Sequence, residues 1–245
     1  MPIRNLLTAS SLMAVCCAPV SAEAALQGRD LDGNPSTVEA YYDTLLNITW
    51  LADANYAKTT GYDADGKMDW ATANLWVSQL EIGGYDHWRL PDVGPVNGVS
   101  YDFTPSFDGS TDNSYNYTTL SKELPHLFYV TLGNPGNYDT AGALSGCYVI
   151  GVDHCFDDQG PFANLAFPYL YWNAGAGPTP AEAWVFRMDM GALGAAAIRP
   201  ENQYLAWAVH PGDVGAVPEP ETYALLLAGL GLVAWRARRE KHRAH

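Results

Sequence analysis

Residues 69–91 read DWATANLWVSQLEIGGYDHWRLP and contain the clearest secondary-structure signals of the chain. Asp69 is a good helix N-cap, because its carboxylate can accept a hydrogen bond from a backbone N–H of the first turn. Four apolar residues then recur at helical spacing, which predicts one amphipathic helix with a buried stripe made of Trp70, Ala73, Val77 and Leu80. Trp76 lies at the flank of this stripe, where we expect it to pack under a loop.

The second half of this stretch places an arginine among apolar residues. Arg89 lies between Trp88 and Leu90 and is followed by Pro91. A guanidinium that is largely buried needs a carboxylate or several carbonyl partners. We therefore interpret Arg89 as a structural pin between a strand and a loop, within a motif that comprises Trp70, Trp88, Arg89, Leu90 and Pro91.

Short strand patterns flank this region on both sides. Upstream, residues 40–42 and 48–51 surround a turn. Downstream, residues 169–172, 183–188 and 204–209 are rich in aromatic and β-branched side chains and are separated by Gly- and Pro-rich turns. The pattern predicts an α+β fold: a single domain over residues 25–214 with short strands and one main helix.

Several of these segments resemble one known family when they are taken together. They are Trp50-Leu51 with Asp53-Ala54-Asn55, residues 68–73, residues 84–91, Tyr171-Trp172, residues 183–186 and residues 206–209. Over most of residues 38–214 the chain resembles the Lcl C-terminal domain family, which implies a C-type-lectin-like α+β fold. That family is best known for adhesion through glycosaminoglycan-type polysaccharides, whereas this chain has few basic residues.

The charge of the domain restricts its partners. Residues 25–217 carry seven Lys and Arg against 23 Asp and Glu, a net charge of about −16. Such a surface repels phosphate backbones, so we expect no nucleic-acid partner. It also repels sulfated and uronic polysaccharides unless divalent cations bridge them. Neutral sugars, basic partners and cations are compatible with it.

The N-terminus has the features of a secretion signal over residues 1–24. Arg4 supplies the positive charge, an apolar stretch follows, and small residues offer cleavage after Ala22 or Ala24. Cys16 and Cys17 raise a lipoprotein alternative, although Val15 occupies the place of the expected small residue.

The C-terminus, residues 217–245, combines three features in order. These are the triplet Pro218-Glu219-Pro220, an apolar segment that predicts a membrane helix over residues 222–235, and a basic cluster with Arg236, Arg238 and Arg239. The basic cluster is expected to stay in the cytoplasm, which leaves the domain outside. This tail resembles the PEP-CTERM sorting signal, which implies processing by an exosortase-type peptidase. A plain single-span anchor is the alternative.

Two cysteines remain after signal cleavage, Cys147 and Cys155. In an oxidising compartment they predict one disulfide that closes a short loop. A metal site that uses both thiolates with His154 is the alternative, but it lacks a recognisable fourth ligand.

A long loop between residues 100 and 117 interleaves aromatic residues with carboxylates and amides. This composition suits a sugar-binding surface, and the candidate ligand-binding residues are Tyr101, Phe107, Asp112, Asn113, Tyr115 and Tyr117. The alternative is that the aromatic side chains fold back over the core.

Calcium is the only cofactor that the sequence suggests. Asp63 and Asp65 begin an oxygen-rich turn, but the glutamate that completes an EF-hand is missing, so a simple Asp-Gly turn is the alternative. The acidic segment 108–113 offers a similar choice.

We expect no enzymatic activity, because the histidines are scattered and no catalytic motif occurs. The sequence thus predicts an exported, non-catalytic binding module at the cell surface or in the exopolysaccharide matrix, with exopolysaccharide as the expected ligand. The expected membrane partner is the inner membrane, through the C-terminal helix. A structural protein that assembles with other envelope proteins is the alternative, and an envelope enzyme is the weakest reading.

Overall fold

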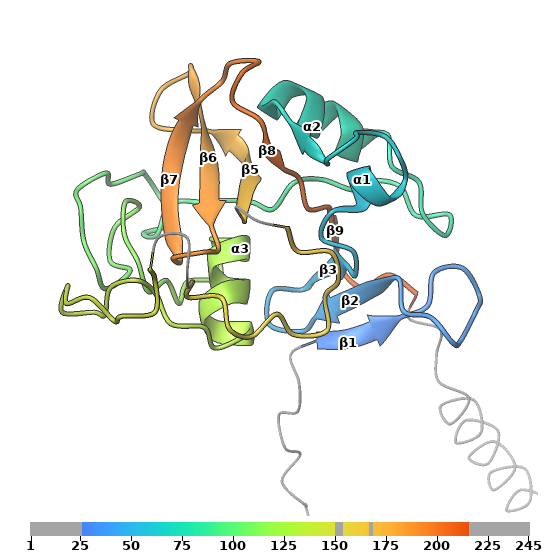
Figure 1. Ribbon diagram of the computed structural model, residues 1–245, viewed down its shortest axis with the longest axis horizontal. Coiled ribbons are helices and arrows are strands. Elements are labelled where there is room, and N and C mark those ends of the chain that lie inside the picture. The colour runs from blue at the N-terminus through green and yellow to red at the C-terminus, as the bar shows by residue number, and fades with distance from the viewer. Residues whose placement is uncertain (1–25, 150–153, 167–168, 216–245) are drawn as a thin grey trace, which may run out of the picture.

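The computed structural model describes residues 26–149, 154–166 and 169–215, which form two β-sheets with short helices around them (Figure 1). Sheet 1 is antiparallel throughout and has the strand order β1 (Leu26–Arg29), β2 (Ala40–Asp43), β3 (Ile48–Leu51) and β9 (Val209–Pro211). Sheet 2 has the order β4 (Lys67–Met68), β8 (Tyr204–Leu205), β5 (Leu170–Ala176), β6 (Glu182–Arg187) and β7 (Ala192–Ala197). Only the β5–β8 pair of sheet 2 is parallel.

The helices are few and short. They are α1 (Tyr56–Thr59), α2 (Trp70–Ser78) and α3 (Glu123–His126), which continues as one π-helical turn, η1 (Leu127–Thr131). Helix α2 packs against β4 and β5, and in Figure 1 α3 lies near the ends of β5–β7 next to sheet 1. The prediction of an α+β fold with one main helix is therefore confirmed.

Helix α2 begins where the sequence predicts. The side chain of Asp69 accepts a hydrogen bond from the backbone N–H of Thr72 at 2.8 Å. Ala73 and Val77 are buried as predicted, and Trp76 beside them is also packed into the core at 2% exposure. The buried face differs from the prediction at Leu80, which lies beyond the helix and is half-buried. The indole of Trp70 donates to the backbone oxygen of Asn173 at 2.9 Å, which keeps that ring at the rim of the buried face.

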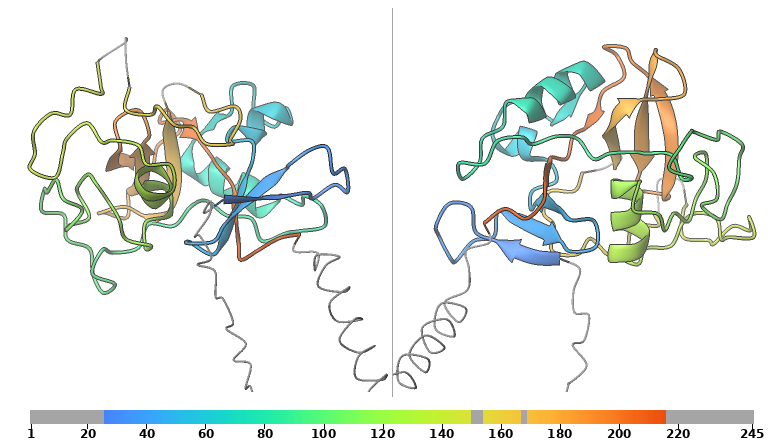
Figure 2. Two further views of the ribbon diagram at one scale, coloured as in Figure 1. Left: turned by 90° about the horizontal axis from the view of Figure 1, so that it is seen from below. Right: turned by 180° about the vertical axis from the view of Figure 1, so that it is seen from behind.

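The apolar run over residues 204–209, predicted as one strand, divides between the two sheets. Its first part is β8 in sheet 2 and its last part begins β9 in sheet 1, and the views in Figure 2 show this segment passing between them. Trp207 lies in the middle, is fully buried, and donates its indole N–H to the backbone oxygen of Leu51 at 2.8 Å. The segment is apolar along its whole length, because it stays buried where it leaves one sheet and enters the other. Its sequence therefore predicts one continuous strand.

One core joins the two sheets. The ring of Trp207 contacts Trp50 of β3, Phe162 and Tyr171 of β5, with ring centroids 4.7–5.7 Å apart. Each large side chain buried in this way stabilises the fold by roughly 1.5–3 kcal/mol. Trp207 thus anchors both sheets in one hydrophobic cluster.

One strand of the fold has no strand signal in the sequence. Strand β7 has the sequence ALGAAA, which carries no β-branched residue and so gives no strand signal.

The membrane helix expected over residues 222–235 and the signal peptide over residues 1–24 lie outside the described residues. Among the residues that are described, no helix has the length and apolar character needed to cross a bilayer.

Candidate functional site

A cavity of about 410 Å³ opens between the segment after Pro91, the start of α3 and the end of β5. Its walls combine one aromatic ring, two carboxylates, a hydroxyl and backbone, and are made by Asp92, Val93, Gly94, Tyr101, Leu120, Ser121, Glu123, Ala174 and Gly175. This volume lies within the usual range of small-molecule sites in proteins.

One wall of the cavity is fixed by the predicted arginine pin. The guanidinium of Arg89 donates to both carboxylate oxygens of Glu123 at 2.7 Å, and Glu123 also accepts the backbone N–H of Asp92 at 2.7 Å. The backbone of Arg89 pairs with Val209 of β9. Burial alone would lower the pKa of Arg89, but the hydrogen bonds and charge of Glu123 raise it, so the guanidinium stays charged. Arg89 therefore has the carboxylate partner that its position requires.

A buried ion pair lies next to the cavity, where Lys122 donates to the backbone oxygen of Gly94 at 3.0 Å. The ammonium of Lys122 is 2.7 Å from Asp112, and both side chains are at most 1% exposed. Asp112 also accepts the backbone N–H groups of Val96 and Asp102 at 3.0 and 2.8 Å. Burial lowers the pKa of Lys122, which the hydrogen bond and charge of Asp112 oppose. This pair ties the loop over residues 93–117 to the start of α3.

Tyr101 presents its ring at the cavity. Its hydroxyl donates to the backbone oxygen of Val93 at 2.6 Å, and its ring stacks with Phe103 at a centroid distance of 5.9 Å. Both rings rest on Trp184 of β6, and both are about 40% exposed (38% and 40%). Tyr101 is therefore an aromatic surface held in one orientation.

The six predicted ligand-binding residues do not form one surface. Only Tyr101 lines the cavity. Asp112 and Tyr117 are buried, since the hydroxyl of Tyr117 accepts the Ser114 N–H at 2.8 Å and donates to the Asp112 backbone oxygen at 3.1 Å. These two residues support the loop from beneath, because loop backbone left without partners would be costly to bury.

The remaining three lie elsewhere on the loop. Phe107 and Tyr115 form a second aromatic cluster with Tyr138, with ring centroids 5.0–6.1 Å apart. Asn113 is exposed and donates to the backbone oxygen of Phe103 at 3.3 Å. The pattern of alternating aromatic and polar residues thus separates into a core side and two surface clusters.

The predicted calcium residues form a turn. Asp63 accepts the backbone N–H groups of Asp65 and Gly66 at 3.0 and 2.8 Å, and Asp65 pairs with the ammonium of Lys67 at 3.2 Å. The turn needs a glycine, because Gly66 has a φ of +80° and a Cβ there would overlap the side chain of Asn55. Both carboxylates accept hydrogen bonds from the backbone of their own loop.

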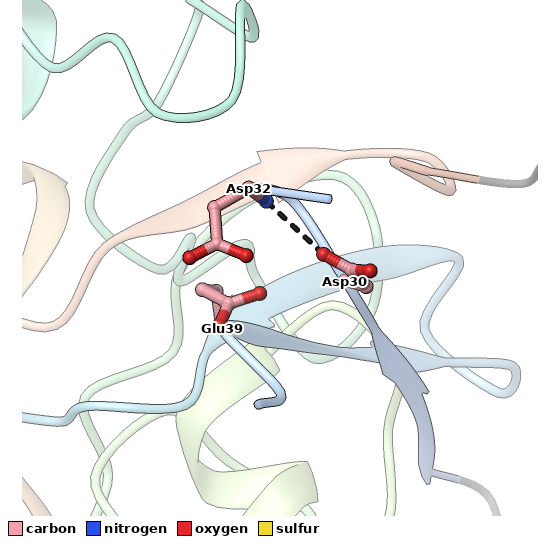
Figure 3. A group of neighbouring side chains, drawn as sticks. All are labelled: Asp30, Asp32 and Glu39. Carbon is pink, nitrogen blue, oxygen red and sulfur yellow. Dashed lines mark hydrogen bonds between the residues drawn. The ribbon is translucent and has the colours of Figure 1, made fainter. Parts of the chain in front are cut away.

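A different acidic group gathers next to sheet 1. Asp30, Asp32 and Glu39 place one carboxylate oxygen each within 4.8 Å of one another (Figure 3). Asp30 accepts the backbone N–H groups of Asp32 and Gly33, and Glu39 accepts that of Leu31 at 2.9 Å. Oxygen ligands of this kind could hold a divalent cation. Sequence reasoning missed the group because Glu39 lies on the far side of a turn.

The disulfide prediction is confirmed. Cys147 and Cys155 are bonded across a sequence separation of 8. The alternative metal site with His154 is thereby excluded for the oxidised protein, because the two thiolates are consumed by the bond.

Sequence reasoning also missed the polar residues that make the cavity. Asp92, Ser121 and Glu123 come from two segments about thirty residues apart. The bridge between Val93 and Lys122 and backbone hydrogen bonds from Glu123 to Asp92 and from Gly94 to Ser121 bring the segments together. A usable signal was the Lys-Glu pair directly before the mostly apolar segment 124–128, since charges beside a buried helix need partners.

The C-terminal tail matches a known sorting motif. Residues 216–239 match the PEP-CTERM protein-sorting motif. The PEP-CTERM motif indicates an exported protein that an exosortase sorts to the cell envelope, and its residues lie outside those the structure describes. No curated protein and no solved structure matches the chain. The resemblance to Lcl C-terminal domains and to a C-type-lectin-like fold stays a prediction.

Proposed function

We propose that this protein is a non-catalytic module that binds envelope polysaccharide in the cavity beside Tyr101. The PEP-CTERM motif supports delivery to the envelope, where polysaccharide is abundant. The observation that carries the proposal is the fixed, half-exposed ring of Tyr101 at a cavity with polar walls. Aromatic faces take the C–H face of a sugar, while carboxylates and hydroxyls bind its OH groups.

The polar groups of the cavity support binding rather than hydrolysis. Both oxygens of Glu123 are occupied by Arg89, and one of them also by the Asp92 N–H, so Glu123 is not available as an acid or nucleophile. Among the residues that line the cavity, this leaves Asp92 as the only carboxylate open to a ligand. Glycoside hydrolysis uses a pair of carboxyl groups, and we therefore propose a binding function.

Membrane attachment completes the proposal. Residues 222–235 would hold the chain in the inner membrane, with the arginine cluster in the cytoplasm and the domain outside. Cleavage by an exosortase at the PEP-CTERM motif would then release the domain to the cell surface or matrix. The intact mass of the mature protein, compared between the membrane and extracellular fractions, tests this step.

One observation favours the alternative, assembly with other envelope proteins. Strand β7 is an edge of sheet 2, and the residues from Gly191 to Ile198 carry no charge. An uncharged edge strand offers N–H and C=O groups to an added strand. Replacing Ala195 with lysine would block such pairing and leave the cavity untouched.

The binding proposal is tested with matched aromatic variants. Tyr101 and Phe107 are both 38% exposed, but only Tyr101 lines the cavity. We expect Tyr101→Ala to weaken binding to purified exopolysaccharide about tenfold, and Phe107→Ala to leave it unchanged. Tyr101→Phe keeps the ring and loses the hydrogen bond to Val93, so it should retain most of the binding.

The outcomes are distinct. Loss of binding in Phe107→Ala but not in Tyr101→Ala would move the site to the second aromatic cluster. Turnover of the polysaccharide by the purified protein would refute the non-catalytic assignment. Co-purification of another envelope protein that depends on β7, without binding of polysaccharide, would favour assembly.

A further inference from the structure

The cations of the domain are almost all neutralised. Of the seven Lys and Arg residues between positions 26 and 215, six lie within 3.9 Å of a carboxylate oxygen: Arg29, Lys67, Arg89, Lys122, Arg187 and Arg199. Within the part of the chain that the structure describes, only Lys58 has no carboxylate at that distance, and it borders a different pocket, formed by α1 and residues 164–166. An anionic ligand would find no free cation in the cavity beside Tyr101.

The cavity itself carries an excess of negative charge. Asp92 and Glu123 contribute two carboxylates, and Arg89 offers the one guanidinium between them, at 2.7 Å from Glu123 and 3.4 Å from Asp92. Arg89 makes its bidentate contact with Glu123, whereas the side chain of Asp92 is 58% exposed. Asp92 therefore presents a carboxylate that a positively charged group of a ligand can reach.

The aromatic wall of the cavity also favours a positively charged ligand. The face of a tyrosine ring is negative and attracts cations within about 6 Å of its centre. The ring of Tyr101 already lies 5.9 Å from the ammonium of Lys122, whose charge is balanced by Asp112 on the buried side. A ring and a carboxylate that border one cavity form a site for an ammonium group attached to an apolar surface.

We propose that the cavity recognises amino-sugar residues with a free ammonium group, as they occur in partially deacetylated hexosamine polysaccharides. The C–H face of the sugar would cover Tyr101, and the ammonium would bind Asp92. The net charge of about −16 over residues 25–217 attracts such a polycation over the whole surface. This inference rests on the proposed polysaccharide-binding function and names its ligand class.

Three oligosaccharides of equal length separate the inference from the function on which it rests. They are an oligomer of glucosamine, one of N-acetylglucosamine and one of galacturonic acid, offered to the mature protein at a mildly acidic pH where the amino groups are protonated. We expect the glucosamine oligomer to bind about tenfold more tightly than its N-acetylated counterpart at low salt. This preference should shrink in about 1 M NaCl, where the Debye length is ~3 Å. The galacturonic acid oligomer should not bind.

Two variants that remove the same charge test whether Asp92 binds the ammonium group. Asp92→Asn should remove the preference for the free amine and keep the binding of the N-acetylated oligomer. Asp86→Asn removes the same charge from a carboxylate that is 72% exposed and does not line the cavity, and it should keep the preference. If both variants lose the preference equally, overall charge and not this cavity is responsible, and the site assignment fails.

The remaining outcomes each decide a point. Equal affinity for the two hexosamine oligomers overturns the inference and leaves the proposed function standing. Binding of none of the three oligomers, nor of purified exopolysaccharide, overturns both. Tighter binding of the uronate oligomer contradicts the charge argument. Displacement of the glucosamine oligomer by a lysine-rich peptide that binds more tightly would assign the site to a basic protein.

Discussion

Two aspartate–lysine pairs in this protein join the same residue types and differ completely in their surroundings. Asp65 and Lys67 are 3.2 Å apart in an exposed turn, with 61% and 31% of their side chains exposed. Asp112 and Lys122 are 2.7 Å apart, with 1% and 0% exposed. The first pair lies on the surface of a turn that does not depend on it, whereas the second connects a long loop to α3. Burial, and not the pattern of charges, decides what an acidic residue contributes.

The buried pair also gives the loop its shape. Asp112 binds Lys122 and two backbone N–H groups of the loop, and the Lys122 ammonium lies within 6 Å of the rings of Tyr101, Tyr117 and Trp184. The orientation of Tyr101 at the cavity therefore depends on a buried contact. The exposed turn at Asp65 has no such consequence.

Breaking the buried pair should have the largest effect. Lys122→Met leaves Asp112 charged and buried without its cation, which costs about 3–5 kcal/mol of unfolding free energy. Lys67→Met, the same change in the exposed pair, should cost less than about 1 kcal/mol. Urea denaturation of both variants measures the difference.

A double variant separates the buried charge from the packing around it. In Lys122→Met with Asp112→Leu, no charge remains, so part of the lost stability should return. The recovery should be incomplete, because Val96 and Asp102 lose the oxygens that accept their backbone N–H groups. Equal losses for Lys122→Met and Lys67→Met would show that the two pairs do not differ as their burial implies.

The disulfide closes another loop covalently, and its removal should cause the second-largest loss of stability. In the chain-entropy description, a bond across 8 residues stabilises the fold by about 2.5 kcal/mol. The Cys147→Ser and Cys155→Ser double variant should lose this amount, and a reducing agent should produce the same loss in the wild type. The reducing agent should leave the stability difference between Lys122→Met and the wild type unchanged, since the two closures are independent.

The sequence predicts those parts of the fold in which one segment decides its own structure. The N-cap at Asp69, the hairpin of β2 and β3 and the disulfide are local, and they occur as predicted. The buried state of Asp112 depends on Lys122, ten residues away, and on Gly94 and Trp184 from other segments. No periodicity records such a meeting, and the same limit explains why Asp92 and Glu123 were not foreseen as neighbours.

A buried tyrosine beneath the loop provides a smaller test. Tyr117→Phe removes the hydroxyl that bonds Ser114 and Asp112, which should cost about 1 kcal/mol. Burial raises the pKa of Tyr117, so the folded state holds its phenolic proton more tightly than the unfolded state. The stability from this group is fully present below pH ~10 and is lost as the pH rises further. Tyr117→Phe should lessen the alkaline loss, whereas Phe107→Ala should not.

The smallest effect belongs to the exposed turn. The backbone N–H of Lys67 lowers the pKa of Asp65, so the small contribution of this carboxylate is present above pH ~4 and is lost as the pH falls below that value. Asp65→Ala should cost less than about 0.5 kcal/mol at neutral pH, and about 1 M NaCl should reduce that cost further, since water and salt screen the pair. The free energy of unfolding of Asp65→Ala and of the wild type, measured across salt concentration and pH, tests this expectation. A cost comparable with that of Lys122→Met would mean that Asp65 has a partner beyond Lys67, and a cost that appears only with added Ca²⁺ would identify that partner as a cation.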